Sequence, residues 1–257
     1  MILLADFPNF TDPGILTALL TLTVLEIILG VDNIIFISIV SNKLPAKQQP
    51  KARTIGLLLA MLFRIILLLT ITWIIQLTNP LFTIDFIKKD GQPVGISWKD
   101  LILLVGGIFL IFKSTLEIHH KLEVARKPEA TVAPSVFSAV ILQIVMVDAV
   151  FSFDSILTAI GLVDNVWVMI IAVVISMLIM IFFSGMISRF INKHPTLQIL
   201  ALAFLIMIGM MLVAEAFHQE INKAYIYTAI AFSMIVELIN MKLRKNHSQV
   251  HLNNDSL

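Results

Sequence analysis

The sequence predicts an all-α membrane protein with seven transmembrane helices, and three observations carry that prediction. Hydrophobic residues make up 58% of the 257-residue chain and charged residues only 14%, against about 25% in soluble domains. The apolar residues gather in seven runs, each near or above the roughly 20 residues that a bilayer-spanning helix needs. Basic residues concentrate in alternate connecting segments, as they do in proteins that cross a membrane repeatedly.

The helices follow one another with short or polar connections. A helix start is visible at Asp12-Pro13, because Asp is a favoured N-cap and Pro suits the first helical position. The polar segment 78–99 predicts a solvent-exposed excursion, and the charged segment 120–134 predicts a loop. Residues 243–257 are polar and predict a disordered cytoplasmic tail. The helices are expected at 14–40, 54–77, 100–119, 135–162, 166–191, 196–217 and 223–241.

The basic residues also set the predicted orientation. One set of alternate segments holds twelve Lys and Arg residues and the opposite set holds four. Because basic residues favour the cytoplasmic side, we expect the N-terminus outside and the C-terminus in the cytoplasm. No basic residue precedes the first helix, so no cleavable signal peptide is expected. The predicted location is the bacterial inner membrane, with multiple passes.

Two of the apolar runs contain matching acidic motifs. A carboxylate in the bilayer core costs about 2.5–3.5 kcal/mol on insertion scales, so intramembrane acids usually serve function. Equal motifs predict two related halves, 12–119 and 135–217, with a seventh helix left over. Since each half crosses three times, the halves must be inserted in opposite senses, as a 3+3 inverted repeat around a midplane site. The motif residues are Glu26, Asp32 and Asn33 in the first half, and Asp148, Asp154 and Ser155 in the second.

The motif side chains predict a binding site for a hard divalent cation. Four carboxylates with amide and hydroxyl oxygens form the ligand set that Mg²⁺, Ca²⁺ and Mn²⁺ prefer. The sequence has no cysteine, which excludes thiolate metal sites and disulfides, and Met180 and other methionines are expected to fill packing gaps. A spacing of six leaves two acids roughly 120° apart around a regular helix. A break at Gly30 would let both acids of the first motif point inward.

The motifs also carry a family resemblance. Leu25-Glu26-x-x-Leu29-Gly30-x-Asp32-Asn33 and Val147-Asp148-x-x-Phe151-Ser152-x-Asp154-Ser155 resemble the TerC family of integral membrane proteins, over about residues 12–242. The resemblance implies one transmembrane domain over 1–242, a seven-helix fold grouped with LysE-type exporters, and no appended soluble domain. Because bacterial members are linked to manganese efflux, it implies Mn²⁺ as the transported ion and the four motif acids as its ligands.

Metal export would leave a cluster of acids empty once per cycle. Carboxylates that share a low-dielectric site resist being ionised together, so the empty site is expected to take up protons. Exchange of H⁺ for metal follows as the predicted coupling. Asp32 and Asp154, displaced to opposite sides of the midplane, are the expected groups where the ion arrives and leaves.

Other functions stay open beside transport. A membrane-protein assembly or insertion factor, a role linked to some plant relatives, would need no midplane ligands, and neither would a tellurium-resistance protein without transport. The Tyr-Asp and Gly-x-Gly-Asp motifs of intramembrane aspartyl proteases are absent, so no enzyme activity is expected. With a net charge of +1, no nucleic-acid partner is indicated. The expected partners are a metal ion and the lipid bilayer; no resident cofactor is expected, and protein partners stay open.

Two basic residues fall inside predicted helices and offer a structural alternative. Arg64 and Lys113 could pair with the motif acids, which would then be buried ion pairs. Arg64 is interpreted as a structural counter-ion, or as a side chain that snorkels from a helix end, ahead of any transport role. Lys113 is interpreted as the helix partner of Glu117 four residues later. The remaining ionisable residues near helix ends, expected to be solvated or interfacial, are His119, His120, His218, Glu215 and Glu237.

Overall fold

The computed structural model describes most of the chain. The described residues are 7–70, 78–89, 92–122, 134–163, 165–219 and 221–244, without the side chains at 31–32, 84–89, 92–94, 134–135, 154, 157–158, 223 and 244. Most of the predicted tail and of the loop 120–134, and the predicted end of the second helix at 71–77, lie outside the described residues. The chain divides into two compact units, Met1–Ile221 and Asn222–Leu257.

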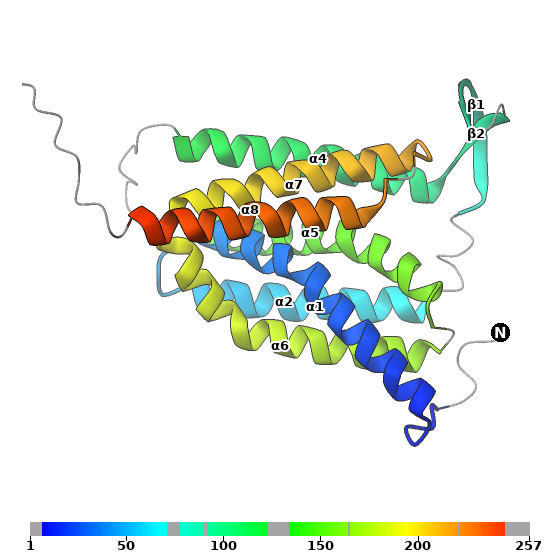
Figure 1. Ribbon diagram of the computed structural model, residues 1–257, viewed down its shortest axis with the longest axis horizontal. Coiled ribbons are helices and arrows are strands. Elements are labelled where there is room, and N and C mark those ends of the chain that lie inside the picture. The colour runs from blue at the N-terminus through cyan, green and yellow to red at the C-terminus, as the bar shows by residue number, and fades with distance from the viewer. Residues whose placement is uncertain are drawn as a thin grey trace, which may run out of the picture. The chain divides into compact units, whose positions relative to one another are not determined.

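Seven helices in the described part are long and apolar enough to cross a membrane, so the predicted all-α membrane fold is confirmed. Their order is that expected from the apolar runs, and most ends fall within a few residues of the prediction. The helices are α1 (Pro13–Ser41), α2 (Gln49–Leu69), α4 (Trp98–Leu122), α5 (Pro134–Ile160), α6 (Val166–Asn192), α7 (Pro195–Ala216) and α8 (Lys223–Arg244), as labelled in Figure 1.

Capping and proline placement explain where these helices begin. Asp12 Oδ1 accepts a hydrogen bond of 2.8 Å from the backbone N–H of Gly14, which confirms the N-cap predicted for α1. Asn165 does the same for α6, accepting from Trp167 N at 2.9 Å. Helix α2 starts at Gln49, before the predicted residue 54, because Pro50 lies in its first turn, where a missing N–H costs nothing.

The polar excursion between α2 and α4 contains a β-hairpin that the sequence did not predict. Strand β1 (Pro80–Lys89) pairs antiparallel with β2 (Gln92–Ser97), with Thr83 opposite Gly95. The second strand passes directly into α4, which begins at Trp98 (Figure 1). Helical and apolar signals dominate the sequence around it, and an isolated two-stranded hairpin gives only a weak local signal, although Ile96 and Ser97 of β2 are buried.

Within the unit Met1–Ile221, the principal helix pairs are unchanged when the first three helices are exchanged for the last three. Helix α1 packs on α6, α2 on α5, and α4 on α7, while α1 also contacts α5 and α2 contacts α6 (Figure 1). Exchanging α1 with α5, α2 with α6 and α4 with α7 returns these same pairs.

Contacts at the helix ends fix the directions of two of these pairs. Helices α4 and α7 are antiparallel, because Lys99 Nζ lies 3.2 Å from Glu215 Oε1 at one end and Lys121 Nζ lies 2.6 Å from Gln198 Oε1 at the other. Helices α1 and α6 are parallel and end together. Asn42 follows α1 and Asn192 is the last residue of α6, and their side-chain amides exchange two hydrogen bonds of 2.6 and 2.9 Å.

Helix α1 is continuous, so the break considered at Gly30 is absent from the backbone of Pro13–Ser41. Gly30 has a different use. A Cβ atom at this position would collide with Sδ of Met180 on α6, so the glycine allows α1 and α6 to approach closely. Met180 is itself buried and fills the space beside the Gly30 backbone. The two residues therefore serve helix packing.

Candidate functional site

Arg64 of α2 joins two of the predicted acids in the interior of the first unit. Its Nη1 donates to Glu26 Oε2 of α1 at 2.5 Å. Its Nη2 and Nε donate to Asp148 Oδ1 and Oδ2 of α5 at 2.8 and 3.1 Å. The three residues are only 2–4% exposed. This two-pronged geometry is the strong form of an Arg–carboxylate pair, and buried charges need such partners. Arg64 is therefore a counter-ion, as the sequence indicated.

The face of α1 that carries Glu26 also carries Asn33. Seven residues span nearly two full turns, so positions 26 and 33 lie on one side of a continuous helix. Asn33 Nδ2 donates to Asp148 Oδ1 at 3.3 Å, which ties α1 to the acid on α5. The Asn33 Oδ1 atom is buried and has no hydrogen-bond partner among the described residues. Most buried polar atoms are satisfied, so this oxygen is an exception that calls for a role.

Thr23 adds a second exception on the same helix. Its Oγ1 is buried and without a described hydrogen-bond partner. Position 23 is three residues before Glu26, so both lie on neighbouring positions of one helix face. The inner face of α1 thus presents two unused oxygen atoms, one on each side of the Glu26 carboxylate along the helix.

On α5, Ser152 supports Asp148 from one turn further along the helix. The Ser152 hydroxyl lies 2.6 Å from the carbonyl oxygen of Asp148 and 3.0 Å from its Oδ2. The sequence analysis did not assign this residue to the site, although its spacing of four from Asp148 is the available signal. Ser155 is buried, but its hydroxyl donates to the Ser152 carbonyl oxygen at 3.3 Å instead of to a carboxylate.

The structure thus brings three of the six predicted site residues together, namely Glu26, Asn33 and Asp148. Ser155 lies further along α5, and the side chains of Asp32 and Asp154 are outside the described part. Among the described residues no group of three or more His, Cys, Asp or Glu side chains is arranged to hold a metal ion. The cluster described here has two carboxylates, one guanidinium and one amide, with a net charge of −1 when its ionisable groups are charged.

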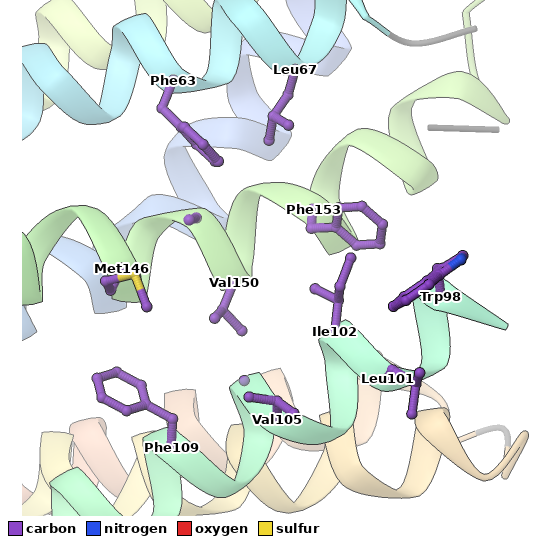
Figure 2. A pocket seen from close by; sticks show the side chains of 12 residues that line it. Phe63, Leu67, Trp98, Leu101, Ile102, Val105, Phe109, Met146, Val150 and Phe153 are labelled. Atoms are coloured by element: carbon purple, nitrogen blue, oxygen red, sulfur yellow. The ribbon is translucent and has the colours of Figure 1, made fainter. Parts of the chain in front are cut away.

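A cavity of about 540 Å³ lies between α2, α4 and α5, two of which carry Arg64 and Asp148. Phe63 and Ala149, the neighbours of Arg64 and Asp148 in the sequence, are among its lining residues. Figure 2 shows aromatic and aliphatic side chains around the space, including Phe109, Val150 and Phe153. Its lining has no carboxylate, amide or hydroxyl side chain, so the cavity suits apolar groups and offers no ligand for a cation.

Polar contacts at the helix ends differ from two expectations. Glu117 pairs with Lys43, at 2.5 Å between Oε2 and Nζ, and the expected pair with Lys113 is wrong. Lys43 comes from the connection between α1 and α2, which the helix packing brings to the end of α4. A spacing of four in the sequence only makes a contact available; here a tertiary partner takes the carboxylate.

His218 was expected to be solvated, and its side chain is 37% exposed, but it also pairs with a buried acid that the sequence did not point to. Its Nε2 lies 3.1 Å from Oδ2 of Asp100, a buried carboxylate that also accepts from the backbone N–H and hydroxyl of Ser97 at 2.8 and 2.6 Å. The backbone of His218 has φ of 58°, a left-handed conformation that is costly for a residue other than glycine. The histidine therefore joins the end of α7 to the start of α4.

Comparison with known proteins adds a family and several relatives. The family model for the integral membrane protein TerC family matches residues 11–251. The UPF0053 inner membrane protein YoaE of Escherichia coli K12 is 49% identical over 238 residues, which are 91% of this chain and 44% of YoaE. The UPF0053 inner membrane protein YgdQ of the same strain is 45% identical over 241 residues, 94% of this chain and 98% of YgdQ.

A third relative, a UPF0053 protein of Haemophilus influenzae, is 45% identical over 247 residues, 93% of this chain and 98% of its own length. The chain therefore spans less than half the length of YoaE but nearly all of the two shorter relatives. No solved structure matches the chain.

Proposed function

Because the chain belongs to the TerC family of integral membrane proteins, we propose that this multi-pass protein of the cell membrane exports a hard divalent cation, with Mn²⁺ as the first candidate. The observation that carries this function is the convergence of Glu26 and Asp148 at one buried point. The two acids come from different helices, 122 positions apart, and begin the two matching motifs. Buried acids that meet inside a membrane protein commonly mark an ion pathway.

The ligand types favour a hard ion. Glu26, Asp148 and the free Oδ1 of Asn33 offer oxygen only, and Mn²⁺, Mg²⁺ and Ca²⁺ are bound by such groups. We assign the second motif acids, Asp32 and Asp154, and the hydroxyl of Ser155 to the same pathway on sequence grounds. The ion is the substrate, and neither a resident cofactor nor an enzymatic step belongs to this function.

The packing pattern supports two related halves around this site. Exchange of α1, α2 and α4 with α5, α6 and α7 preserves the principal helix pairs, and the exchanged helices α4 and α7 are antiparallel. These are the relations that an inverted repeat produces, with substrate held at the interface of the halves. We propose this repeat, with the N-terminus outside and the C-terminus in the cytoplasm, and inward proton flow as the driving force.

Transport in proteoliposomes tests this function directly. Purified protein is reconstituted, and the flux of Mn²⁺, Mg²⁺, Ca²⁺ and Zn²⁺ is followed with an internal metal-sensitive dye, with and without a pH gradient. We expect Mn²⁺ flux that depends on the gradient and is lost in Glu26→Gln and Asp148→Asn. Lys113→Gln is the matched control, because it removes a charge from a membrane helix outside the cluster.

Three results would count against this function. Flux that is equal in empty and protein-containing vesicles would exclude transport and favour an assembly role. Full flux in both carboxylate variants would remove Glu26 and Asp148 from the pathway. Flux that ignores the pH gradient would exclude proton coupling while leaving metal transport in place.

A further inference from the structure

We propose that Arg64 is a tethered counter-ion: its guanidinium occupies the ion site when no metal is bound, and it must leave for metal to bind. This role rests on the proposed export function and adds to it a competitor built into the chain. Arg64 is thereby a regulating residue of the site, and it is not itself a metal ligand.

The guanidinium and a metal ion would compete for the carboxylate oxygens of Glu26 and Asp148. The guanidinium uses Glu26 Oε2 and both carboxylate oxygens of Asp148 at 2.5–3.1 Å. A divalent ion that binds Glu26 and Asp148 at roughly 2.0–2.6 Å draws on the same two carboxylates, of which only Glu26 Oε1 makes no bond to the guanidinium. A cation at that point would lie against the positively charged guanidinium, with little water to screen the repulsion. The metal ion and the Arg64 guanidinium therefore compete for these two carboxylates.

Asn33 provides a second observation that points to an absent cation. Its Nδ2 atom binds Asp148, but its buried Oδ1 acceptor has no hydrogen-bond partner among the described residues while Arg64 fills the site. If the cluster served only to pair Arg64 with Glu26 and Asp148, this buried acceptor without a donor would destabilise the fold and serve no purpose. As a third oxygen ligand beside Glu26 and Asp148, the same atom gains a partner when metal replaces the guanidinium.

Charge explains what the exchange achieves. Without metal and without Arg64, Glu26 and Asp148 would leave two uncompensated negative charges in a buried site, a costly arrangement. With Arg64 in place the three groups carry a net charge of −1. The guanidinium thus lowers the cost of the metal-free state and, because it competes for the ligands, it also weakens metal binding and speeds release.

The surroundings of α2 leave room for the Arg64 guanidinium to withdraw from the two carboxylates. Phe63 and Leu67, on the turns around Arg64, border the apolar cavity of about 540 Å³ (Figure 2). Shifting α2 into this space breaks no polar contact there, because the cavity lining has no polar side chain other than the Trp98 indole. The guanidinium can withdraw with its helix, and the bonds that must break are those to the two carboxylates.

The test separates affinity from turnover. Mn²⁺ binding to purified protein is measured by electron paramagnetic resonance, and flux is measured in proteoliposomes, for wild type, Arg64→Gln, Arg64→Lys and the control Lys113→Gln. We expect Arg64→Gln to bind Mn²⁺ about 5–150-fold more tightly, the usual range for coupled sites, while its maximal flux falls. Arg64→Lys keeps the charge but loses the fork, so its affinity should lie between the two. Lys113→Gln should match wild type in both measurements.

Opposite results overturn the role of Arg64. A folded Arg64→Gln protein, judged by a single symmetric gel-filtration peak, that binds Mn²⁺ equally or more weakly shows a merely structural arginine. If that variant does not fold, wild type decides: with Mn²⁺ bound, anomalous scattering should place the metal on Glu26 and Asp148, with the guanidinium displaced. A metal bound while all three Arg64 bonds persist excludes the exchange. If neither wild type nor any variant binds a divalent ion, the export function fails as well. That result is distinct from Mn²⁺ binding without exchange, which overturns only the role of Arg64.

Discussion

Gly107 of α4 and Gly209 of α7 bring the backbones of their helices into direct contact. A Cβ atom on Gly107 would lie 2.6 Å from the carbonyl oxygen of Gly209, and a Cβ atom on Gly209 would lie 2.8 Å from that of Gly107. The contact is reciprocal, since each glycine also faces the residue four positions after its partner, Val213 or Ile111. Neither backbone can retreat without moving a whole helix, so side chains are excluded from both positions.

Substitution at these glycines should therefore destabilise the bundle. Gly107→Ala or Gly209→Ala is expected to cost about 1–3 kcal/mol, the usual range for overpacking, and to lower the thermal unfolding midpoint in detergent. Gly185→Ala in α6 is the control, because nothing lies within 4 Å of its added Cβ. Equal midpoints for the three variants would mean that α4 and α7 are not in backbone contact.

Removal of Arg64 should destabilise the fold through the charges that it leaves behind. We expect Arg64→Met to cost about 3–5 kcal/mol, because Glu26 and Asp148 would be buried without a counter-ion. Adding Glu26→Gln and Asp148→Asn to Arg64→Met should recover much of this loss, since no buried charge remains. Unfolding of all combinations as a mutant cycle measures the coupling, and strictly additive costs would contradict the ion-pair account.

Asn33 should matter more to transport than to stability. Asn33→Leu removes one long hydrogen bond of 3.3 Å and an unsatisfied oxygen, so we expect the free energy of unfolding to change by about 1 kcal/mol or less. Metal flux in proteoliposomes should fall strongly, because the variant lacks the free Oδ1 ligand. Flux at the wild-type level with normal stability would exclude Asn33 from the pathway.

The absence of cysteine makes the predicted orientation directly measurable. A single cysteine at Asn42, just after α1, should react with a membrane-impermeant maleimide only in inverted vesicles, and a cysteine at Thr83 in the hairpin only in spheroplasts. Thr83 is an exposed strand residue, whereas Asn42→Cys gives up the two hydrogen bonds to Asn192, so both variants are labelled only after they elute as a single symmetric gel-filtration peak. Reaction of Asn42→Cys from the outside would reverse the orientation and with it the direction assigned to transport.

The sequence predicted the helices well because each apolar run has the length of a bilayer crossing and few competing signals. It missed the start of α2, where Pro50 opens a helix instead of ending one, and the β-hairpin, whose two strands lie between strong helical signals. The use of Gly30 for packing against Met180 depends on which helix lies opposite, and no local pattern encodes that choice.

The candidate site was predictable only in part, because local motifs mark single residues but not the partners that tertiary packing brings to them. The motifs singled out Glu26, Asn33 and Asp148, which the structure brings together, and Arg64 was identified as a counter-ion. Arg64 pairs with Glu26 and Asp148 at the same time because α1, α2 and α5 meet at this point, and sequence spacing does not reveal that packing. Long-range partners such as Lys43 and Glu117 were missed because they are neighbours only after the helices assemble.

The oxygen-bearing face of α1 bears on the width of the dielectric barrier that the proposed transport has to cross. Thr23, Glu26 and Asn33 extend over ten residues of one continuous helix, which is about 15 Å at 1.5 Å per residue. The hydrocarbon core of a bilayer is roughly 30 Å thick. In the export that we propose, an ion moving along this face would meet oxygen-bearing side chains over half of that depth, and the dielectric barrier would be about half as wide as the bilayer itself.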